Sequence, residues 1–172
     1  KGLDMAISNA NDAISMVSTA EGAMDEITNM LQRMRELAVQ AGTGTTASAD
    51  RLYLNSEFKE LRSEIDRIVA NTEYNGRTIL NAAAGGAATA STVAFQVGSD
   101  PKQTISTTFG NFLNTSGALS GMASKTLSTL TVASAINQAS AVITELDVVI
   151  GDVSGQRATF GAITNRLTHA ID

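Results

Sequence analysis

Apolar residues recur three or four positions apart without interruption from Leu3 to Ala41. This spacing is typical of a helix whose one face is packed along its whole length. At a rise of 1.5 Å per residue such a helix is roughly 58 Å long, well beyond the usual three or four turns. We expect Gly42 and Gly44 to end it, and Ser48 or Asp50 to cap the next helix. The predicted stripe is Leu3, Ile7, Ala10, Ile14, Val17, Ala20, Met24, Ile27, Leu31, Met34, Ala38 and Ala41.

Two further segments show the same periodicity. A second, shorter helix is predicted at about 49–70, with one apolar face and one charged face. A third, long helix is predicted near the end, although three glycines weaken the pattern and Arg157 falls where an apolar residue is expected. The apolar positions are Leu54, Phe58, Leu61, Ile65 and Ile68, then Ile136, Ala139, Ile143, Leu146, Ile150, Val153, Phe160, Ile163, Leu167 and Ala170. The charged face of the second helix carries Glu57, Glu60, Arg62, Glu64, Asp66 and Arg67.

The middle of the chain has a different pattern. Apolar residues alternate at Val93–Val97 and again at Ile105–Phe109, on either side of a turn that contains Pro101, which predicts a β-hairpin. Asn75-Gly76 is a strong turn signal. The Ala/Gly-rich run at 82–91 is typical of a linker, and 114–129 is too rich in Gly and Ser to assign.

Together these patterns predict a mainly α fold: an elongated antiparallel bundle of two long helices plus a shorter one, with a small β-hairpin region. Residues 1–172 are interpreted as one domain, divided into an N-terminal helical part (1–76), a central part (77–130) and a C-terminal helix (131–172). Both ends of the sequence lie inside helical pattern, so we expect a fragment whose two ends meet at one end of a rod.

Composition excludes several classes of function. Aromatic residues make up only 4% of the chain and Trp is absent, which favours a thin bundle over a thick globular core. A net charge of -5 argues against nucleic-acid binding. The uncharged stretches are rich in Ser, Thr, Asn and Gln, so no membrane span is expected. Without cysteine there is no disulfide or thiolate site.

Residues for catalysis are also lacking in the sequence. The only histidine, His169, is expected to be a solvent-facing helical residue, and no HExxH motif is present. Glu57, Glu60 and Glu64 lie at helical spacing beside arginines, which is typical of a solvated helix face rather than a metal or acid-base site. We therefore predict no enzymatic activity, no metal and no cofactor.

Several long segments resemble the conserved flanks of bacterial flagellin, in the same order. They are SNANDAISMVSTAEGAMDEITNMLQRMRELAVQ, EIDRIVANTEYNGRTIL and GAITNRLTHAID, with AFQVGSDPKQTIS similar to the short β-element of the flagellin core. The resemblance implies an extracellular, motility-linked structural subunit of the flagellar filament, exported through the flagellar type III system. It implies contacts with other flagellin subunits, an export chaperone and the cap protein. The terminal coiled-coil helices and the large outer domains of many flagellins have no counterpart here.

The same resemblance suggests contact residues. It implies that the host Toll-like receptor for flagellin binds through Gln32, Arg33, Leu37 and Glu57, a surface that overlaps a subunit contact. The alternative is that Arg33 and Glu57 are solvated charges and that Leu37 packs on the second helix. Motility-linked subunit contacts map to Ile150 and Arg166, although an isoleucine in this pattern is more often part of the core.

Two other functions remain as alternatives. A hook-filament junction protein of the same assembly has a similar core, but the LQRMRELAVQ, EIDRI and NGRTIL runs favour flagellin. A filament-borne peptidase is disfavoured because no HExxH motif is present.

Overall fold

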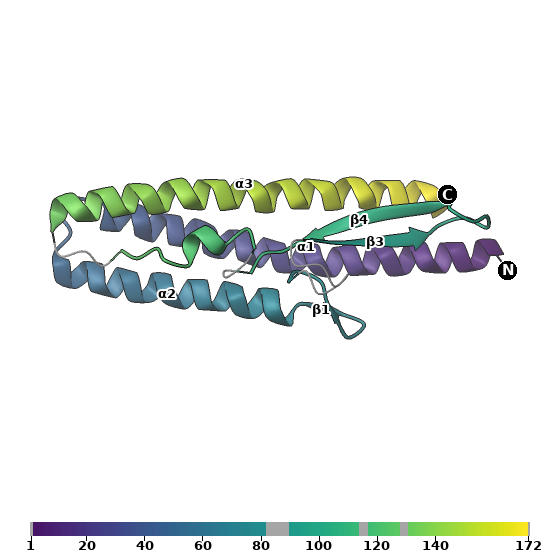
Figure 1. The fold of residues 1–172 in the computed structure, drawn as a ribbon, viewed down its shortest axis with the longest axis horizontal. Coiled ribbons are helices and arrows are strands. Elements are labelled where there is room, and N and C mark those ends of the chain that lie inside the picture. The colour runs from purple at the N-terminus through teal and green to yellow at the C-terminus, as the bar shows by residue number, and fades with distance from the viewer. Residues whose placement is uncertain (1, 82–89, 114–116, 128–130, 172) are drawn as a thin grey trace.

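The computed structural model describes residues 2–81, 90–113, 117–127 and 131–171. These residues form a rod of three α-helices with a β-hairpin laid against one side (Figure 1). Helix α1 (Gly2–Ala41) runs antiparallel to α2 (Ser48–Asn71) and to α3 (Val132–Ile171), so α1 begins at the same end of the rod at which α3 finishes. The predicted fold of two long helices, one shorter helix and a small β region is confirmed.

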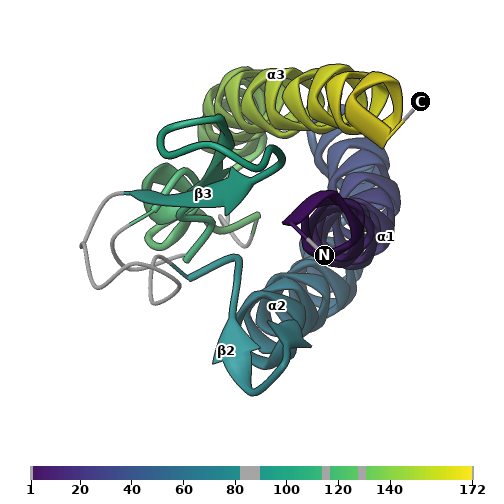
Figure 2. The same cartoon turned by 90° about the vertical axis from the view of Figure 1, so that its right-hand side faces the viewer.

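Helix α1 is the central element of the bundle. Figure 2 shows α2 and α3 on opposite sides of α1, while the hairpin and the central segment fill the inside of the arc. Most of the predicted stripe is buried, but Leu3 and Ile7 are 67% and 40% exposed, so this part of the prediction is wrong. Near its N-terminus α1 extends beyond the end of α2 (Figure 1), and a helix without that neighbour buries a narrower face.

Helix α2 differs from the prediction at its start and in its buried face. Ala47 occupies the N-cap position without a side-chain hydrogen bond, so neither Ser48 nor Asp50 caps the helix. The Arg62 side chain, predicted to face solvent, turns inward and donates from Nη1 to the carbonyl oxygens of Met122 and Ala123, each at 3.0 Å. The buried residues are Arg51, Asn55, Phe58, Ile65 and Val69, whereas Leu54, Leu61 and Ile68 are half-buried.

Helix α3 is continuous through its glycines. A Cβ added at Gly151, Gly155 or Gly161 would meet no atom within 4 Å, so none of the three marks a close contact inside this chain. Arg157 takes the place of an apolar residue because its Nη2 lies 3.0 Å from Oδ1 of Asp25 on α1. Two predicted core positions, Ile136 and Ala170, are exposed; the buried residues are Ala135, Ala139, Val142, Leu146, Val149, Val153, Phe160, Ile163 and Leu167.

The strands form two antiparallel pairs. Strands β1 (Glu73–Tyr74) and β2 (Arg77–Thr78) flank Asn75 and Gly76, whose φ angles of 51° and 72° suit a tight two-residue turn. Strands β3 (Ala90–Gln96) and β4 (Thr104–Gly110) form the predicted hairpin. Along β4 the side chains are buried alternately, and Phe109 packs against Phe160 of α3 with ring centroids 5.3 Å apart.

Two side chains of α2 form hydrogen bonds with the central segment, residues 117–127. It contains the short 3-10 helix η1 (Ser120–Met122), and Leu119, Met122 and Leu127 are buried. Besides the bonds from Arg62, Oδ1 of Asn55 accepts a hydrogen bond from the Leu127 main-chain N–H at 2.9 Å. The predicted linker at 82–91 lies almost entirely outside the described residues.

Candidate functional site

Two arginines on the outer side of α1 connect this helix to its two neighbours. Arg33 and Arg35 are two positions apart and therefore point roughly 200° apart around the helix axis. Arg33 Nε donates to Oε1 of Glu57 on α2 at 2.8 Å, and Arg35 Nε donates to Oδ1 of Asp147 on α3, also at 2.8 Å. The surface of α1 between these bridges is therefore bounded on both sides by ion pairs.

The bridges are electrostatically favourable but solvated. The hydrogen bonds from Arg33 to Glu57 and then to Glu36, whose Oε2 lies 3.0 Å from Nη1, raise the pKa of Arg33 above its usual value. The Asp147 carboxylate raises the pKa of Arg35 in the same way. The Arg33 and Glu57 side chains are 49% and 44% exposed, and pairs in water contribute little to stability. Their charged groups are accessible to a partner.

We call the residues that line the surface of α1 from the bridging Arg35 toward Arg33 the outer strip of α1. The strip has a shallow hollow of about 360 Å³ and includes an apolar side chain, Val39, that is 50% exposed among polar neighbours. An accessible apolar side chain framed by arginines and amides is a common composition of a protein contact surface. The strip consists of Gln32, Arg35, Glu36, Val39 and Gln40.

The structure separates the four predicted receptor-contact residues. Gln32 and Arg33 are exposed on α1, and Glu57 is joined to Arg33 across the helix boundary. Leu37 has no exposed surface and belongs to the hydrophobic core. Gln32, Arg33 and Glu57 are therefore accessible at the surface, while Leu37 supports the helix from inside.

The two predicted subunit-contact residues on α3 do not form one site. Ile150 is half-buried and packs against the core, whereas Arg166 is exposed. Sixteen positions of helix separate them by roughly 24 Å along the axis. The two residues therefore lie in different parts of α3.

Sequence reasoning does not find the bridge between α1 and α3. Arg35 is part of the charged run on α1, but nothing in the sequence connects it to Asp147, which lies 112 positions away. Val39 also escapes prediction, because the apolar stripe passes through Ala38 instead. The available signal is that Val39 is an apolar residue outside the stripe, next to Gln40 on a polar face of the helix.

Metal-binding sites are not found in the described parts of the chain. No three His, Asp or Glu side chains there lie close enough to hold a metal ion. His169 is exposed near the end of α3. Over the same residues, no helix has the length and apolarity that a membrane span needs. An elongated bundle with an exposed, polar outer strip is consistent with a structural or binding protein.

Comparisons with known proteins agree with this class. Residues 1–84 match the family model of the bacterial flagellin N-terminal helical region. A flagellin of Halalkalibacterium halodurans is 36% identical over 171 residues, which is 99% of this chain and 58% of that protein. Flagellin B of Vibrio cholerae is 40% identical over 121 residues, covering 70% of this chain and 31% of that protein.

Solved structures show the same fold. The crystal structure of Bacillus cereus flagellin is similar over 96% of this chain and 87% of that chain, with a TM-score of 0.75 and 29% identity. The structure of a putative flagellar hook-associated protein from Vibrio parahaemolyticus is similar over 99% of this chain and 84% of that chain, with a TM-score of 0.78 but only 14% identity. The latter likeness concerns the fold alone.

The chain belongs to the bacterial flagellin family. Flagellins are structural proteins and not enzymes, which agrees with the prediction of a non-catalytic chain. The chain spans about a third of the length of the Vibrio flagellin and just over half of the Halalkalibacterium flagellin.

Proposed function

We propose that this chain is the helical core of a structural subunit of the bacterial flagellar filament, located outside the cell and in contact with other copies of itself. The observation that supports this most directly is the flagellin similarity over 99% of the chain, which includes all three helices. The rod shape is consistent with a subunit that contacts its neighbours sideways, and the outer strip supplies an accessible polar surface for such contacts.

The alternative is a hook-filament junction protein. A putative hook-associated protein has a similar fold over 99% of this chain, so the fold by itself does not separate the two functions. Sequence identity favours flagellin, at 36% to 40% against 14%. We therefore keep the filament subunit as the proposed function.

Further partners follow from family membership. We propose export through the flagellar type III system with an export chaperone, and growth of the filament beneath the cap protein. Ile150 and Arg166 are proposed as contacts to different neighbouring subunits, because they lie far apart on α3.

Host recognition is a separate proposal. A Toll-like receptor for flagellin would meet Gln32, Arg33 and Glu57, and the support for this is their shared exposure across the boundary between α1 and α2. The guanidinium of Arg33 and the carboxylate of Glu57 each retain exposed surface while paired, so both can form further hydrogen bonds with a partner.

A chimera tests the filament proposal. Residues 1–172 would replace the matching region of the Halalkalibacterium flagellin in a strain that lacks its own flagellin. We expect long filaments by electron microscopy and restored swimming. Secreted, folded chimera that forms only short caps on the hook would support the junction protein instead, and secreted chimera that forms no assembly would contradict both proposals.

Receptor signalling tests the host proposal. Arg33→Ala and Glu57→Ala are each expected to reduce reporter activation in receptor-expressing cells, with helicity unchanged by circular dichroism. Arg67→Ala is the matched control, because it breaks another exposed pair, Glu64–Arg67, away from the proposed contact. Equal signalling by all three variants would show that the contact lies elsewhere.

A further inference from the structure

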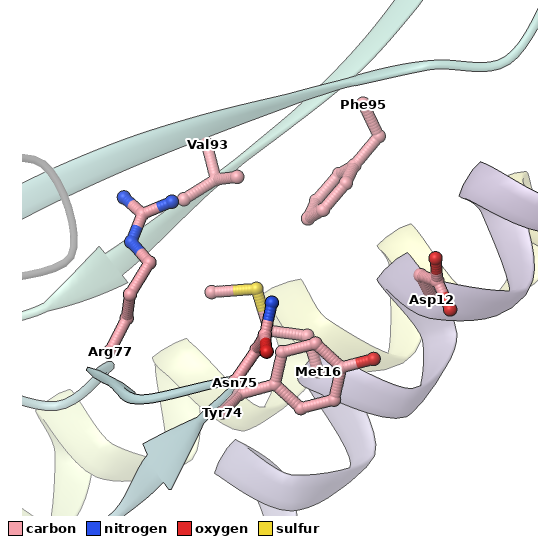
Figure 3. Close-up of a pocket in the computed structure, with 7 residues that line it drawn as sticks. All are labelled: Asp12, Met16, Tyr74, Asn75, Arg77, Val93 and Phe95. Carbon is pink, nitrogen blue, oxygen red and sulfur yellow. The ribbon is translucent and has the colours of Figure 1, made fainter.

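A trough runs between β3, α1 and the β1–β2 turn. Figure 3 shows Val93 and Phe95 pointing from β3 toward Met16 of α1, with Tyr74 on the opposite wall and Asp12 at one end. The hollow is about 540 Å³. A second hollow of about 370 Å³, lined in part by Asn9 and Ala94, shares Asp12 and Phe95 with the first and so continues along the strand. We call the two together the β3 trough.

Among the described residues, one edge of β3 pairs with no other strand. The β3–β4 sheet has two strands, and the N–H of Val97 donates to the carbonyl of Gln103 at 2.9 Å, so the odd-numbered residues of β3 exchange main-chain bonds with β4. The main-chain groups of Thr92 and Ala94 consequently point away from β4. The carbonyl of Gln96 points the same way and accepts a hydrogen bond from Asn9 Nδ2 at 3.1 Å.

Among the described residues, the part of this edge at Thr92 and Ala94 has none of the features that usually protect a sheet edge. Within the described chain, no protein group is hydrogen-bonded to the main-chain N–H or C=O of Thr92 or Ala94, and both residues are exposed. Natural sheet edges are commonly blocked by Lys, Pro or a bulge. Strand β3 has the sequence ASTVAFQ, with no charge and no proline, and its register with β4 is regular.

The trough supplies side-chain pockets beside this edge. Val93 and Phe95 are half-buried, so they present apolar surface to anything lying in the trough. The Asp12 carboxylate is exposed and takes part in none of the ion pairs found among the described residues. Arg77 lines the first hollow at the end opposite Asp12 (Figure 3). An open main-chain edge, an apolar wall and an acidic group at the Asp12 end together match an extended peptide with alternating apolar side chains and one basic residue placed toward Asp12.

We propose that the β3 trough binds an extended segment of a partner protein, which adds to the edge of β3 as a third strand. Main-chain groups of the segment pair with Thr92 and Ala94, its apolar side chains lie against Val93 and Phe95, and a lysine or arginine meets Asp12. A second copy of β3 is a poorer occupant because its sequence brings no basic side chain to Asp12.

Peptide titration followed by NMR tests the proposal. The probe is a blocked seven-residue peptide of alternating Thr and Val with one central Lys, added to the full chain at up to about 1 mM. We expect amide shifts at Thr92, Ala94 and Asp12, and slower hydrogen exchange of the Thr92 and Ala94 amides at saturation. The matched control is the same peptide with alternate main-chain nitrogens methylated, which cannot form the ladder and is expected not to bind.

A second comparison tests the acidic end. Replacing Lys by norleucine, or Asp12 by Asn, is expected to weaken binding by up to about fivefold, the range of an exposed ion pair, without changing which amides respond. Binding by the methylated peptide, or shifts confined to residues outside the trough, would overturn the proposal. Protection of the Thr92 and Ala94 amides in a dimer without peptide would show that a second copy occupies the edge, and would overturn the proposal. Absence of binding by the unmethylated peptide would also reject the proposal.

Discussion

The inner and outer sides of the bundle are built differently. Inside the arc of helices, the hairpin is packed through apolar contacts such as Phe109 against Phe160, and both residues have no exposed surface. On the outer side, α1 is joined to its neighbours by solvated pairs such as Arg33–Glu57. Burial of apolar area contributes far more free energy than exposed ion pairs do. The inner side therefore determines stability, and the outer strip is available for contacts.

The largest expected effect is on the inner side. Phe160→Ala removes a fully buried ring that packs on β4, and we expect the free energy of unfolding to fall by about 3 to 5 kcal/mol. Urea unfolding followed by circular dichroism measures it. Val39→Ala on the outer strip is the control and is expected to have a much smaller effect. Similar losses for the two variants would break the contrast between the two sides.

A polar inner contact comes next. Arg62→Met retains the stem of the side chain but removes the donor to the carbonyls of Met122 and Ala123, and we expect a loss of about 1 to 3 kcal/mol. Hydrogen exchange should become faster in residues 117–127, because this segment loses its hydrogen bonds from Arg62. Arg67→Met, on an exposed pair, serves as the control. Unchanged exchange would show that Arg62 does not hold the segment.

Two glycines give opposite predictions for the same substitution. A Cβ at Gly42 would lie 2.9 Å from the Cβ of Ala139, so Gly42→Ala should push α1 away from α3 and destabilise the chain by about 1 to 3 kcal/mol. At Gly151, inside α3, the space is open, and Gly151→Ala should stabilise by about 0.5 to 1 kcal/mol. Thermal unfolding compares them. The same sign for both variants would contradict the close approach at Gly42.

The smallest effect is expected at an exposed pair of α2. Hydrogen bonds from Arg67 lower the pKa of Glu64 below its ordinary value of 4.5. The pair therefore contributes to stability above that value, and the contribution is lost as the pH falls through the lowered pKa. We expect Glu64→Gln to have a slightly lower melting temperature than the parent chain at neutral pH and the same one in strong acid. A difference that grows on acidification would contradict this.

The sequence predicts the helices well because a period of three or four residues depends only on local geometry. Periodicity shows which face of a helix is buried, but not how wide that face is or how far the neighbouring helices extend along it. It therefore wrongly places Leu3 and Ile7 in the core. The role of Arg62 is not predictable, because its acceptors are main-chain carbonyls about 60 positions away. In the candidate site, Arg33 and Glu57 follow from family resemblance, whereas the Arg35–Asp147 bridge requires the structure.

The central position of α1 has a consequence for how the chain folds. Helix α1 has neighbours on both sides, and one of them, α3, begins about 90 positions further along the sequence. Contacts between such distant segments require closure of a large loop before they return any stabilisation. The bundle must therefore remain incompletely folded until α3 has been made, and we expect a late, all-or-none collapse of α3 onto α1.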